Sequence, residues 1–312
     1  MEIREDVSLK NLTTFKIGGE AKFFVEVKSE GDVKEAYNFA AEKGLAVLIL
    51  GGGSNVIISD DGFTGLVIKL NNKNLEINEQ VVRVGAGLVL EDLIDKTIEH
   101  NLAGLENMTL IPGTVGGAVV QNAGSFGISM EKFVTQVKFF DIKNNEFNTF
   151  SNKECQFSYR DSIFKNKSNY LVYEVELNLL SGIKQEIQNI RQKNYDYKKA
   201  SLDWSPSAGC AFKNIKYKSL DENSLEKLNN AGVDLAKAKQ FGKLSAGALI
   251  DNLGLKGFSI SGAAVSTKHG NFIINKKDAK AEDIIALQRI VQQKIRNKFN
   301  IQLQLEQVLI GF

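Results

Sequence analysis

The sequence predicts an α+β protein with a β-rich, glycine-rich N-terminal region and an α+β C-terminal domain. In the first half of the chain, short runs rich in valine and isoleucine alternate with glycine, as is typical of strands joined by tight turns. From Ile183 onward, longer stretches with helical spacing predominate. A length of 312 residues fits two or three compact units better than one core.

Two helices and several strands are predicted in the glycine-rich region. The first helix spans 32–43 and ends at Gly44, and its apolar face comprises Val33, Ala36, Tyr37, Ala40 and Ala41. The second spans 88–101, and its inward face comprises Leu90, Leu93, Ile94, Thr97 and Ile98. Strands are predicted at 46–50, 56–58, 65–70 and 170–179, with a hairpin over 134–150 that turns at 143–146.

The C-terminal part is predicted to begin with a polar helix from Ile183 to about Lys199. Further helices are expected at 220–230, 246–253 and 281–298, and a strand at 271–275. The buried face of the 281–298 helix comprises Ile284, Leu287, Val291 and Ile295. The final residues, 301–312, alternate apolar and polar side chains and predict a strand.

Composition excludes several classes of protein. The 39 basic and 37 acidic side chains leave a net charge of only +2, which argues against binding a nucleic acid polymer. The apolar run Leu45–Leu50 is too short to span a membrane, and the N-terminus lacks a secretion signal, so a cytoplasmic protein is expected. Two cysteines and two histidines are too few for a disulfide framework or a His-based metal centre.

Two glycine-rich motifs could bind a ligand through the backbone. GGGSN at 51–55 follows an apolar strand, where it could bind a phosphate or form a plain strand-to-strand turn. A Rossmann motif is disfavoured because the third glycine is missing and a strand follows. GAGLVLEDL at 85–93 precedes a helix but carries only G-x-G. The stretch 111–127, IPGTVGGAVVQNAGSFG, concentrates six glycine or asparagine residues among small side chains, which favours a ligand-binding loop.

Eight motifs together resemble the UDP-N-acetylenolpyruvoylglucosamine reductase (MurB) family and occur in the family's order. They are NLTTFKIGG (11–19), LGGGSN (50–55), IPGTVGGAVVQNAG (111–124), YRDSIFK (159–165), SAGCAFKN (207–214), SAGALIDNLGLKG (245–257), ISGAAVSTKH (260–269) and QLEQVLIG (304–311). The resemblance implies an FAD-binding fold of the vanillyl-alcohol-oxidase (PCMH) type in two subdomains, 1–70 and 71–182. It further implies a substrate-binding domain over 183–302 and a C-terminal strand over 303–312.

The activity implied by the resemblance is reduction of the enolpyruvyl ether of UDP-N-acetylglucosamine to UDP-N-acetylmuramate. NADPH reduces tightly bound FAD, and hydride then passes from flavin N5 to C3 of the enolpyruvyl group. The implied cofactor contacts are Gly51, Gly52, Gly53, Ser54, Asn55, Pro112, Gly113, Thr114, Gly117, Ala118, Asn122, Ala123 and Gly124. No metal is implied, and a monomer is expected.

Three residues match the family's catalytic positions. Charge developing on the substrate carboxylate calls for a fixed cation, and Arg160 matches the family's arginine. Glu306 matches a glutamate that polarises the enolate with Arg160, as a protonated carboxyl in a buried site; the sequence alone indicates an exposed strand residue. Cys210 stands where many members have the serine that donates a proton to C2. An ordinary thiol has a pKa of about 8.5 and is mostly protonated at pH 7, so it can also donate a proton.

Composition alone favours a different interpretation of both cysteines. A cysteine outside a disulfide is most often a small buried apolar residue, and for Cys155 this is the only interpretation. The implied substrate contacts are Tyr159, Lys199, Asn214 and His269, of which Lys199 is matched only by proximity. The short segment between Leu180 and Pro206 places the chain in the branch without an inserted tyrosine-bearing loop, which leaves open which residue closes the diphosphate pocket.

Two other functions remain open from the sequence. A flavin oxidase or dehydrogenase of a small alcohol or hydroxy acid could use the same glycine loops, since these contact the cofactor and not the substrate. A non-catalytic flavin-binding module is also compatible with the loops, but it leaves Arg160 and Glu306 without a role.

Overall fold

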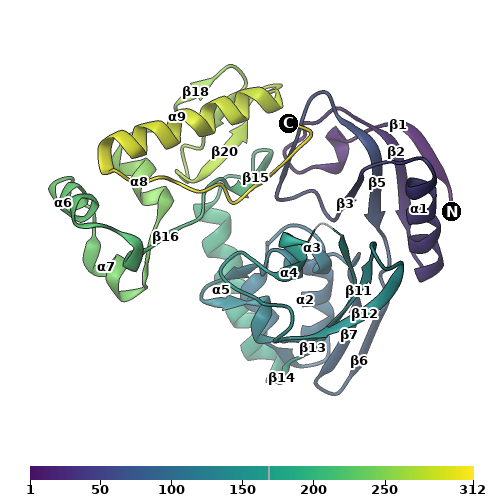
Figure 1. Cartoon of the computed structure of the whole chain (residues 1–312). Coiled ribbons are helices and arrows are strands. Elements are labelled where there is room, and N and C mark those ends of the chain that lie inside the picture. The colour runs from purple at the N-terminus through teal and green to yellow at the C-terminus, as the bar shows by residue number, and fades with distance from the viewer. Residues whose placement is uncertain (168) are drawn as a thin grey trace. The chain divides into compact units, whose positions relative to one another are not determined.

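The computed structural model describes residues 1–167 and 169–312, which form two compact units (Figure 1). Unit 1 comprises Met1–Val7, Ala21–Gly52 and Thr64–Ala200, and unit 2 comprises Ser8–Glu20, Gly53–Phe63 and Ser201–Phe312. Each unit has a hydrophobic core of its own. The mixture of helices and sheets confirms the predicted α+β class.

The first sheet of unit 1 has the strand order β1-β2-β5-β3. Its strands are β1 (Ile3–Ser8), β2 (Glu20–Val27), β3 (Val47–Leu50) and β5 (Phe63–Leu70), with β3 parallel to β5. Helix α1 (Glu30–Glu42) begins with a capping box between Ser29 and Asp32 and ends before Gly44, whose φ is +61°. Four of its five predicted apolar-face residues are buried, but Ala41 is exposed, because the buried stripe is narrower than predicted.

The second sheet of unit 1 is antiparallel, in the order β12-β11-β13-β7-β6. Its strands are β6 (Leu75–Asn78), β7 (Val81–Gly85), β11 (Val134–Asp141), β12 (Glu146–Ser151) and β13 (Tyr170–Asn178). The predicted hairpin is confirmed as β11 and β12, with Phe139 opposite Asn148. Helix α3 (Val115–Val120) packs against β13 and β7, and this contact places the glycine-rich stretch 111–127 beside the sheet.

Hydrogen bonds join α5 (Lys184–Ser201) to α2 (Leu90–Glu99) within unit 1. Glu91 accepts from Thr109 Oγ1 at 2.6 Å and from Arg191 Nη2 at 2.7 Å. Lys198 Nζ donates to the Thr109 carbonyl at 2.6 Å. By its contacts α5 therefore belongs with the N-terminal region, although the sequence placed the boundary at residue 183. The assignment of separate functions to the domains stays a prediction.

Unit 2 is built on a four-stranded sheet crossed by one long helix. The sheet has the order β15-β20-β19-β18, formed by β15 (Ser207–Cys210), β18 (Ser259–Ile260), β19 (Ala263–Val265) and β20 (Phe272–Asn275). Helix α9 (Ala281–Phe299) lies along β18, β19 and β20 (Figure 1). All four predicted apolar-face residues of α9 are fully buried, and each such side chain stabilises the unit by about 1.5–3 kcal/mol.

The predicted C-terminal strand is only partly right. Residues 308–310 form β21 (Val308–Ile310), which pairs in parallel with β4 (Val56–Ile58). Before it, the chain makes only an isolated bridge between Leu305 and Phe212. The alternating pattern there reflects burial of Ile301 and Leu303 in the core of unit 2, with no strand ladder beside them.

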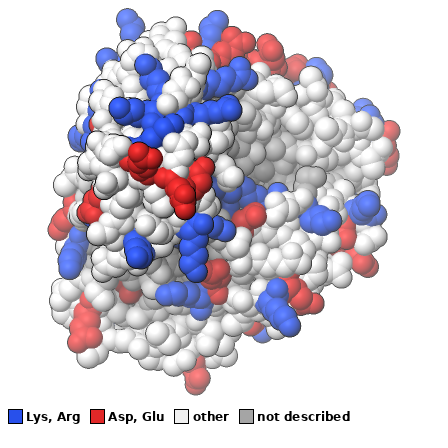
Figure 2. Space-filling model, turned by 60° about the vertical axis from the view of Figure 1, so that its left-hand side comes forward, with Lys and Arg blue, Asp and Glu red and all other residues white. Residues whose placement is uncertain are grey.

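The remaining elements are short. They are β8 (Leu102–Ala103), β9 (Gly124–Ser125), β10 (Ile128–Ser129), β14 (Leu180–Ser181), β16 (Ile215–Lys216), β17 (Lys243–Leu244), α4 (Ile163–Asn166), α6 (Glu222–Asn230), α7 (Leu235–Gln240), α8 (Ala246–Asn252) and the 3₁₀ turns η1 (Lys10–Leu12), η2 (Leu105–Met108), η3 (Met130–Lys132) and η4 (Tyr217–Ser219). Helices α3, α4 and α7 were not predicted from the sequence. Figure 2 shows both basic and acidic side chains on one face of the molecule, in small groups of like charge. Among the described residues, no helix is long and apolar enough to cross a membrane.

Candidate functional site

The two glycine motifs of unit 1 lie against each other, backbone to backbone. Gly51 and Gly52 follow β3, and Gly113 and Thr114 precede α3. A Cβ atom added to Gly52 would lie 2.5 Å from the Gly113 Cα atom, and one on Gly51 would lie 2.9 Å from Thr114 Oγ1. Glycine is therefore required at position 52 for this approach, and the two stretches predicted to bind the cofactor form one surface.

Helix α3 begins within the stretch that the sequence indicated was a loop. Thr114 is its N-cap, and Thr114 Oγ1 accepts from the Gly117 amide at 3.4 Å. Gly117 itself is exposed, and a Cβ atom there would meet no protein atom closer than 3.6 Å. Protein packing therefore does not require glycine at position 117. Its bare backbone fits the close approach of a bound group such as FAD.

Three residues of GGGSN belong to unit 2. Gly53 has a φ of +63° and packs against the Leu12 carbonyl, where a Cβ atom would clash. Asn55 Nδ2 donates to the Glu306 carbonyl at 3.2 Å, and the Asn55 carbonyl accepts from the Val308 amide at 3.0 Å. Ser54 is half-buried. Within unit 2, the end of GGGSN is thus tied to the segment that carries Glu306.

Arg160 lies at the tip of a two-residue turn in unit 1. Ser158 and Asp161 exchange two backbone hydrogen bonds, of 3.0 and 3.1 Å, so that Tyr159 and Arg160 project between them. Arg160 has a φ of +56°, a conformation uncommon for residues other than glycine. Its Nη2 donates to the Gly124 carbonyl at 3.0 Å, which places the guanidinium beside the 111–127 stretch. Such strained conformations persist where the surroundings fix them, often at functional sites.

Asn122 connects this turn to the glycine-rich stretch. Its Nδ2 donates to the Ser158 carbonyl at 2.8 Å and to Glu131 Oε2 at 3.0 Å, while its Oδ1 accepts from the Glu131 amide. These bonds use both amide hydrogens, so the Asn122 side chain has no further hydrogen to donate to a cofactor. The other predicted cofactor residues here differ in exposure: Ala118 and Ala123 are buried, Gly113 and Gly124 are half-buried and Pro112 is exposed.

Cys210 and Glu306 lie near each other in unit 2. Cys210 ends β15, opposite Phe272, and the next residue, Ala211, accepts from the Glu306 amide at 2.9 Å. Both Cys210 and Glu306 are half-buried, so neither the fully buried nor the fully exposed alternative from the sequence holds for them. Cys155 is fully buried, as predicted, and burial together with the Glu154 charge raises the pKa of its thiol to about 12.

The predicted substrate contacts are divided between the units. Tyr159 and Lys199 belong to unit 1, whereas Asn214 and His269 belong to unit 2. Asn214 Oδ1 accepts from the Ala246 amide at 3.1 Å, at the start of α8. His269 Nδ1 accepts from the Asn271 amide at 3.3 Å, and burial lowers the pKa of the ring, so the imidazole is neutral at pH 7.

Two neighbouring lysines on α5 differ in burial, and the sequence did not predict this difference. Lys199 is exposed, with its Nζ 5.7 Å from the centre of the Tyr195 ring. Lys198 is buried, and burial lowers the pKa of its ammonium to about 8. Lys198 Nζ also lies 5.4 Å from the centre of the Phe126 ring, beside the glycine-rich stretch. The spacing of apolar residues on this polar helix gives no signal that would separate the two.

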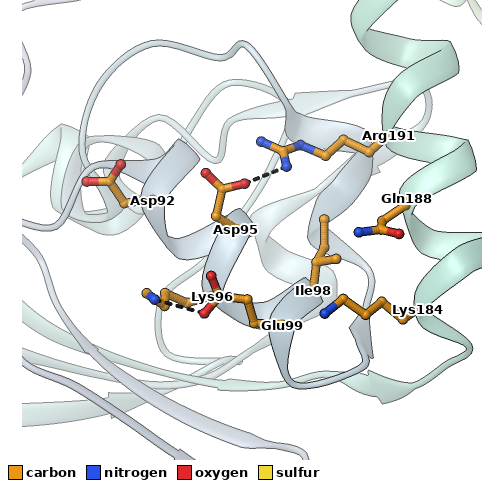
Figure 3. A pocket seen from close by; sticks show the side chains of 8 residues that line it. All are labelled: Asp92, Asp95, Lys96, Ile98, Glu99, Lys184, Gln188 and Arg191. Carbon is orange, nitrogen blue, oxygen red and sulfur yellow. Dashed lines mark hydrogen bonds and ion pairs between the residues drawn. The ribbon is translucent and has the colours of Figure 1, made fainter.

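A cavity of about 430 Å³ lies elsewhere in unit 1, between α2 and α5 (Figure 3). It is lined by Asp92, Asp95, Lys96, Ile98, Glu99, Lys184, Gln188 and Arg191. Four of its charged side chains form two pairs, Arg191 with Asp95 at 2.5 Å and Lys96 with Glu99 at 2.8 Å. None of the predicted site residues lines it.

Comparisons with known proteins match the chain along its whole length. Residues 199–310 match the model of the UDP-N-acetylenolpyruvoylglucosamine reductase C-terminal domain, and residues 21–148 match that of an FAD binding domain. The UDP-N-acetylenolpyruvoylglucosamine reductase of Solibacter usitatus is 33% identical, over 100% of this chain and 97% of that protein. The protein of the same name from Halalkalibacterium halodurans is 35% identical, over 99% of this chain and 95% of its own.

A solved structure agrees with these relatives. The MurB crystal structure from Thermus caldophilus is 31% identical and covers 99% of this chain and 98% of its own, with a TM-score of 0.78. Together with the FAD binding domain match, this similarity confirms the predicted FAD-binding fold. The chain belongs to the UDP-N-acetylenolpyruvoylglucosamine reductase (MurB) family.

Proposed function

We propose that this protein reduces UDP-N-acetylenolpyruvoylglucosamine to UDP-N-acetylmuramate, with FAD as bound cofactor and NADPH as hydride donor. The observation that carries the proposal is the similarity to reductases of that name over the whole chain, so that both the FAD-binding and the C-terminal parts are represented. An oxidase on the same cofactor-binding fold would share only the first part. The expected setting is peptidoglycan precursor synthesis in the cytoplasm, and hence growth and division of the cell, by a monomeric enzyme.

The cofactor is proposed to lie on the surface formed by the two glycine motifs of unit 1. The exposed backbone at Gly117 and the contact between Gly52 and Gly113 support this placement. Gly53, Ser54 and Asn55 are proposed to contribute the remaining contacts of GGGSN. When bound, FAD supplies the hydride that passes from NADPH to C3 of the enolpyruvyl group.

Arg160 is proposed to bind the substrate carboxylate. Reduction at C3 drives negative charge through C2 onto the carboxylate, and a guanidinium can hold that group with two parallel hydrogen bonds. The left-handed turn and the bond from Nη2 to the Gly124 carbonyl fix this cation beside the glycine-rich stretch. A charge placed before the reaction begins needs no reorganisation as the substrate charge develops.

Cys210 is proposed to deliver the proton to C2, and Glu306 to polarise the enolate together with Arg160. The half-buried thiol of Cys210 is one residue from Ala211, whose carbonyl holds the Glu306 backbone. A protonated thiol can act as the general acid in this step. Tyr159, Lys199, Asn214 and His269 are proposed to bind the sugar nucleotide, with His269 acting as a neutral hydrogen-bonding group.

Steady-state turnover tests the function. Flavin-loaded protein is mixed with NADPH and the enolpyruvyl sugar nucleotide, and the product is identified by mass spectrometry. The proposal expects NADPH oxidation that depends on the sugar nucleotide and yields a product two hydrogens heavier. If NADPH is consumed equally without the sugar nucleotide, and a small alcohol or hydroxy acid instead reduces the flavin, the enzyme acts on another substrate.

A further inference from the structure

Lys165 makes two hydrogen bonds that connect the Arg160 turn to helix α3. It lies on α4, five residues after Arg160, and its side chain is half-buried. Its Nζ donates to the Arg160 carbonyl at 3.1 Å and to Gln121 Oε1 at 2.7 Å. Gln121 is the C-cap residue of α3, so one ammonium bridges the turn and the helix that begins at the glycine motif.

The bond to Lys165 also fixes the Gln121 amide. An ammonium can only donate, so the amide must present its oxygen to Lys165. With the oxygen so placed, Gln121 Nε2 is buried and has no acceptor among the described residues. A buried donor without an acceptor carries a desolvation cost, and rotating the amide would instead point its NH₂ group at a cation. The geometry is therefore governed by Lys165.

The same segment carries further bonds to α3 and to the residues that follow it. Ser162 Oγ donates to the Val120 carbonyl at 2.7 Å, and Asn122 Nδ2 donates to the Ser158 carbonyl at 2.8 Å. These two bonds hold the ends of the turn. Lys165 binds the carbonyl of Arg160 itself, and it thereby restrains the peptide that follows the left-handed residue.

We propose that Lys165 is a positioning residue for Arg160. It holds the strained turn against α3, and through the turn it sets the position of the guanidinium next to the Gly124 carbonyl. This inference rests on the proposed function, because it assigns the effect of Lys165 to binding of the substrate carboxylate. A misplacement of about 1 Å at a reacting centre can reduce the rate about 10²-fold.

Hydrogen exchange on the flavin-loaded protein tests the structural part directly. Lys165→Met removes the charge and keeps the length of the side chain, and Lys167→Met is the matched control, since Lys167 is exposed on the same segment. We expect the amides of Ser158 and Asp161, which close the turn, to exchange about tenfold faster or more in Lys165→Met only. Unchanged exchange in Lys165→Met overturns the inference whatever the substrate is.

Half-reaction kinetics test the consequence. In Lys165→Met, flavin reduction by NADPH is expected to stay within about twofold, while reoxidation by the enolpyruvyl sugar nucleotide slows about 10- to 100-fold. On an Arg160→Ala background, Lys165→Met should cause no further loss, because Lys165 acts through Arg160. Losses that multiply, or reoxidation at the wild-type rate, would overturn the proposal.

The inference can still be tested if Lys165→Met does not fold or if the proposed activity is absent. If Lys165→Met does not fold, Gln121→Leu removes one of the two acceptors and is expected to give smaller changes of the same kind, and the wild-type exchange pattern in it overturns the inference. If the wild-type enzyme does not reduce the sugar nucleotide, the proposed function fails. Hydrogen exchange then decides alone, with faster exchange at Ser158 and Asp161 supporting the inference and unchanged exchange overturning it.

Discussion

Unit 1 and unit 2 hold their proposed catalytic side chains by different means. In unit 1, two backbone bonds close the Arg160 turn, but side chains tie it to its surroundings: Lys165 binds the Arg160 carbonyl, Asn122 binds the Ser158 carbonyl and Ser162 binds the Val120 carbonyl. In unit 2, Cys210 and Glu306 lie on segments joined mainly by backbone bonds, with Ala211 accepting from Glu306 and β15 pairing with β20, and the Asn55 side chain adds one bond to the Glu306 carbonyl. Backbone bonds tolerate a change of side chain. We therefore expect the activity of Cys210 variants to depend on whether the new side chain can donate a proton. The activity of variants around Arg160 should depend on whether the guanidinium keeps its position.

The largest effect is expected from Cys210→Ala. The variant should keep flavin reduction by NADPH near normal and slow reduction of the sugar nucleotide about 10²- to 10⁴-fold, the usual contribution of a general acid. Rapid-mixing measurement of the two half-reactions separates the steps. A loss below about tenfold would remove Cys210 from proton donation.

Arg160→Lys should be nearly as damaging, by about 10²- to 10³-fold in kcat, although the charge is kept. An ammonium lacks the planar fork that binds a carboxylate through two bonds, and it cannot be expected to reproduce the bond to the Gly124 carbonyl. Steady-state kinetics with the sugar nucleotide measure the loss. Activity at the wild-type level would mean that Arg160 does not bind the carboxylate.

Two glycine substitutions separate protein packing from cofactor binding. Gly52→Ala should destabilise the protein by about 1–3 kcal/mol, because the new Cβ atom meets Gly113. Gly117→Ala should leave the unfolding free energy of the flavin-free protein within about 1 kcal/mol, since its Cβ atom has room, and weaken FAD binding instead. Chemical denaturation and flavin titration measure the two effects. Tight FAD binding by Gly117→Ala would contradict the proposal that the cofactor lies against α3.

Acid should loosen the contact of α5 with α2 in unit 1. Burial alone would raise the pKa of Glu91, but hydrogen bonds from Thr109, Arg191 and Leu110 lower it below its usual value of 4.5. The ionised Glu91 carboxylate therefore contributes fully to the free energy of unfolding above about pH 4.5. This contribution is lost as pH falls through the lower pKa of the folded state. Glu91→Gln should cost about 1–3 kcal/mol at pH 7 and progressively less below pH 4.5. Denaturation at several pH values, followed by hydrogen exchange in α5, checks this; a pH-independent difference contradicts it.

The smallest effect is expected from Cys210→Ser, which should stay within about tenfold of the wild type, because a hydroxyl can also donate the proton. The backbone bonds that place residue 210 are unchanged by this substitution. Half-reaction kinetics beside Cys210→Ala provide the control. If serine is as damaging as alanine, the position depends on the thiol itself, and the contrast between the units weakens.

Local periodicity predicted six of the nine described α-helices, but it gave no sign of strands β1 and β2. The inward faces of α2 and α9 are confirmed residue by residue, because 3.6-residue spacing reports burial directly. Periodicity failed where glycine content and packing against distant segments determine the secondary structure. Helix α3 was missed because its VGGAVV sequence has little helical propensity, and it is held by the Thr114 cap and by packing on the sheet. The strand predicted over 301–312 was right only for 308–310, because the alternation before it reflects core packing without a partner strand.

The site was predictable mainly through motifs. YRDSIFK contains both Arg160 and Lys165, but no spacing rule indicates that a side chain will bind the backbone carbonyl five residues earlier. Likewise, the burial of Lys198 and the exposure of Lys199 follow from how α5 meets the Thr109 carbonyl, a contact between segments far apart in the sequence. The residue types were visible in the sequence, whereas their hydrogen-bonding partners were not.

Reoxidation of the reduced flavoprotein tests the central claim most directly. Wild-type protein is reduced with one equivalent of NADPH without oxygen and then mixed with the enolpyruvyl sugar nucleotide, while the flavin absorbance is followed. Rapid return of the oxidised spectrum is predicted, with UDP-N-acetylmuramate formed in equal amount. A flavin that stays reduced until oxygen is admitted would contradict the account, and the enzyme would then act on another substrate.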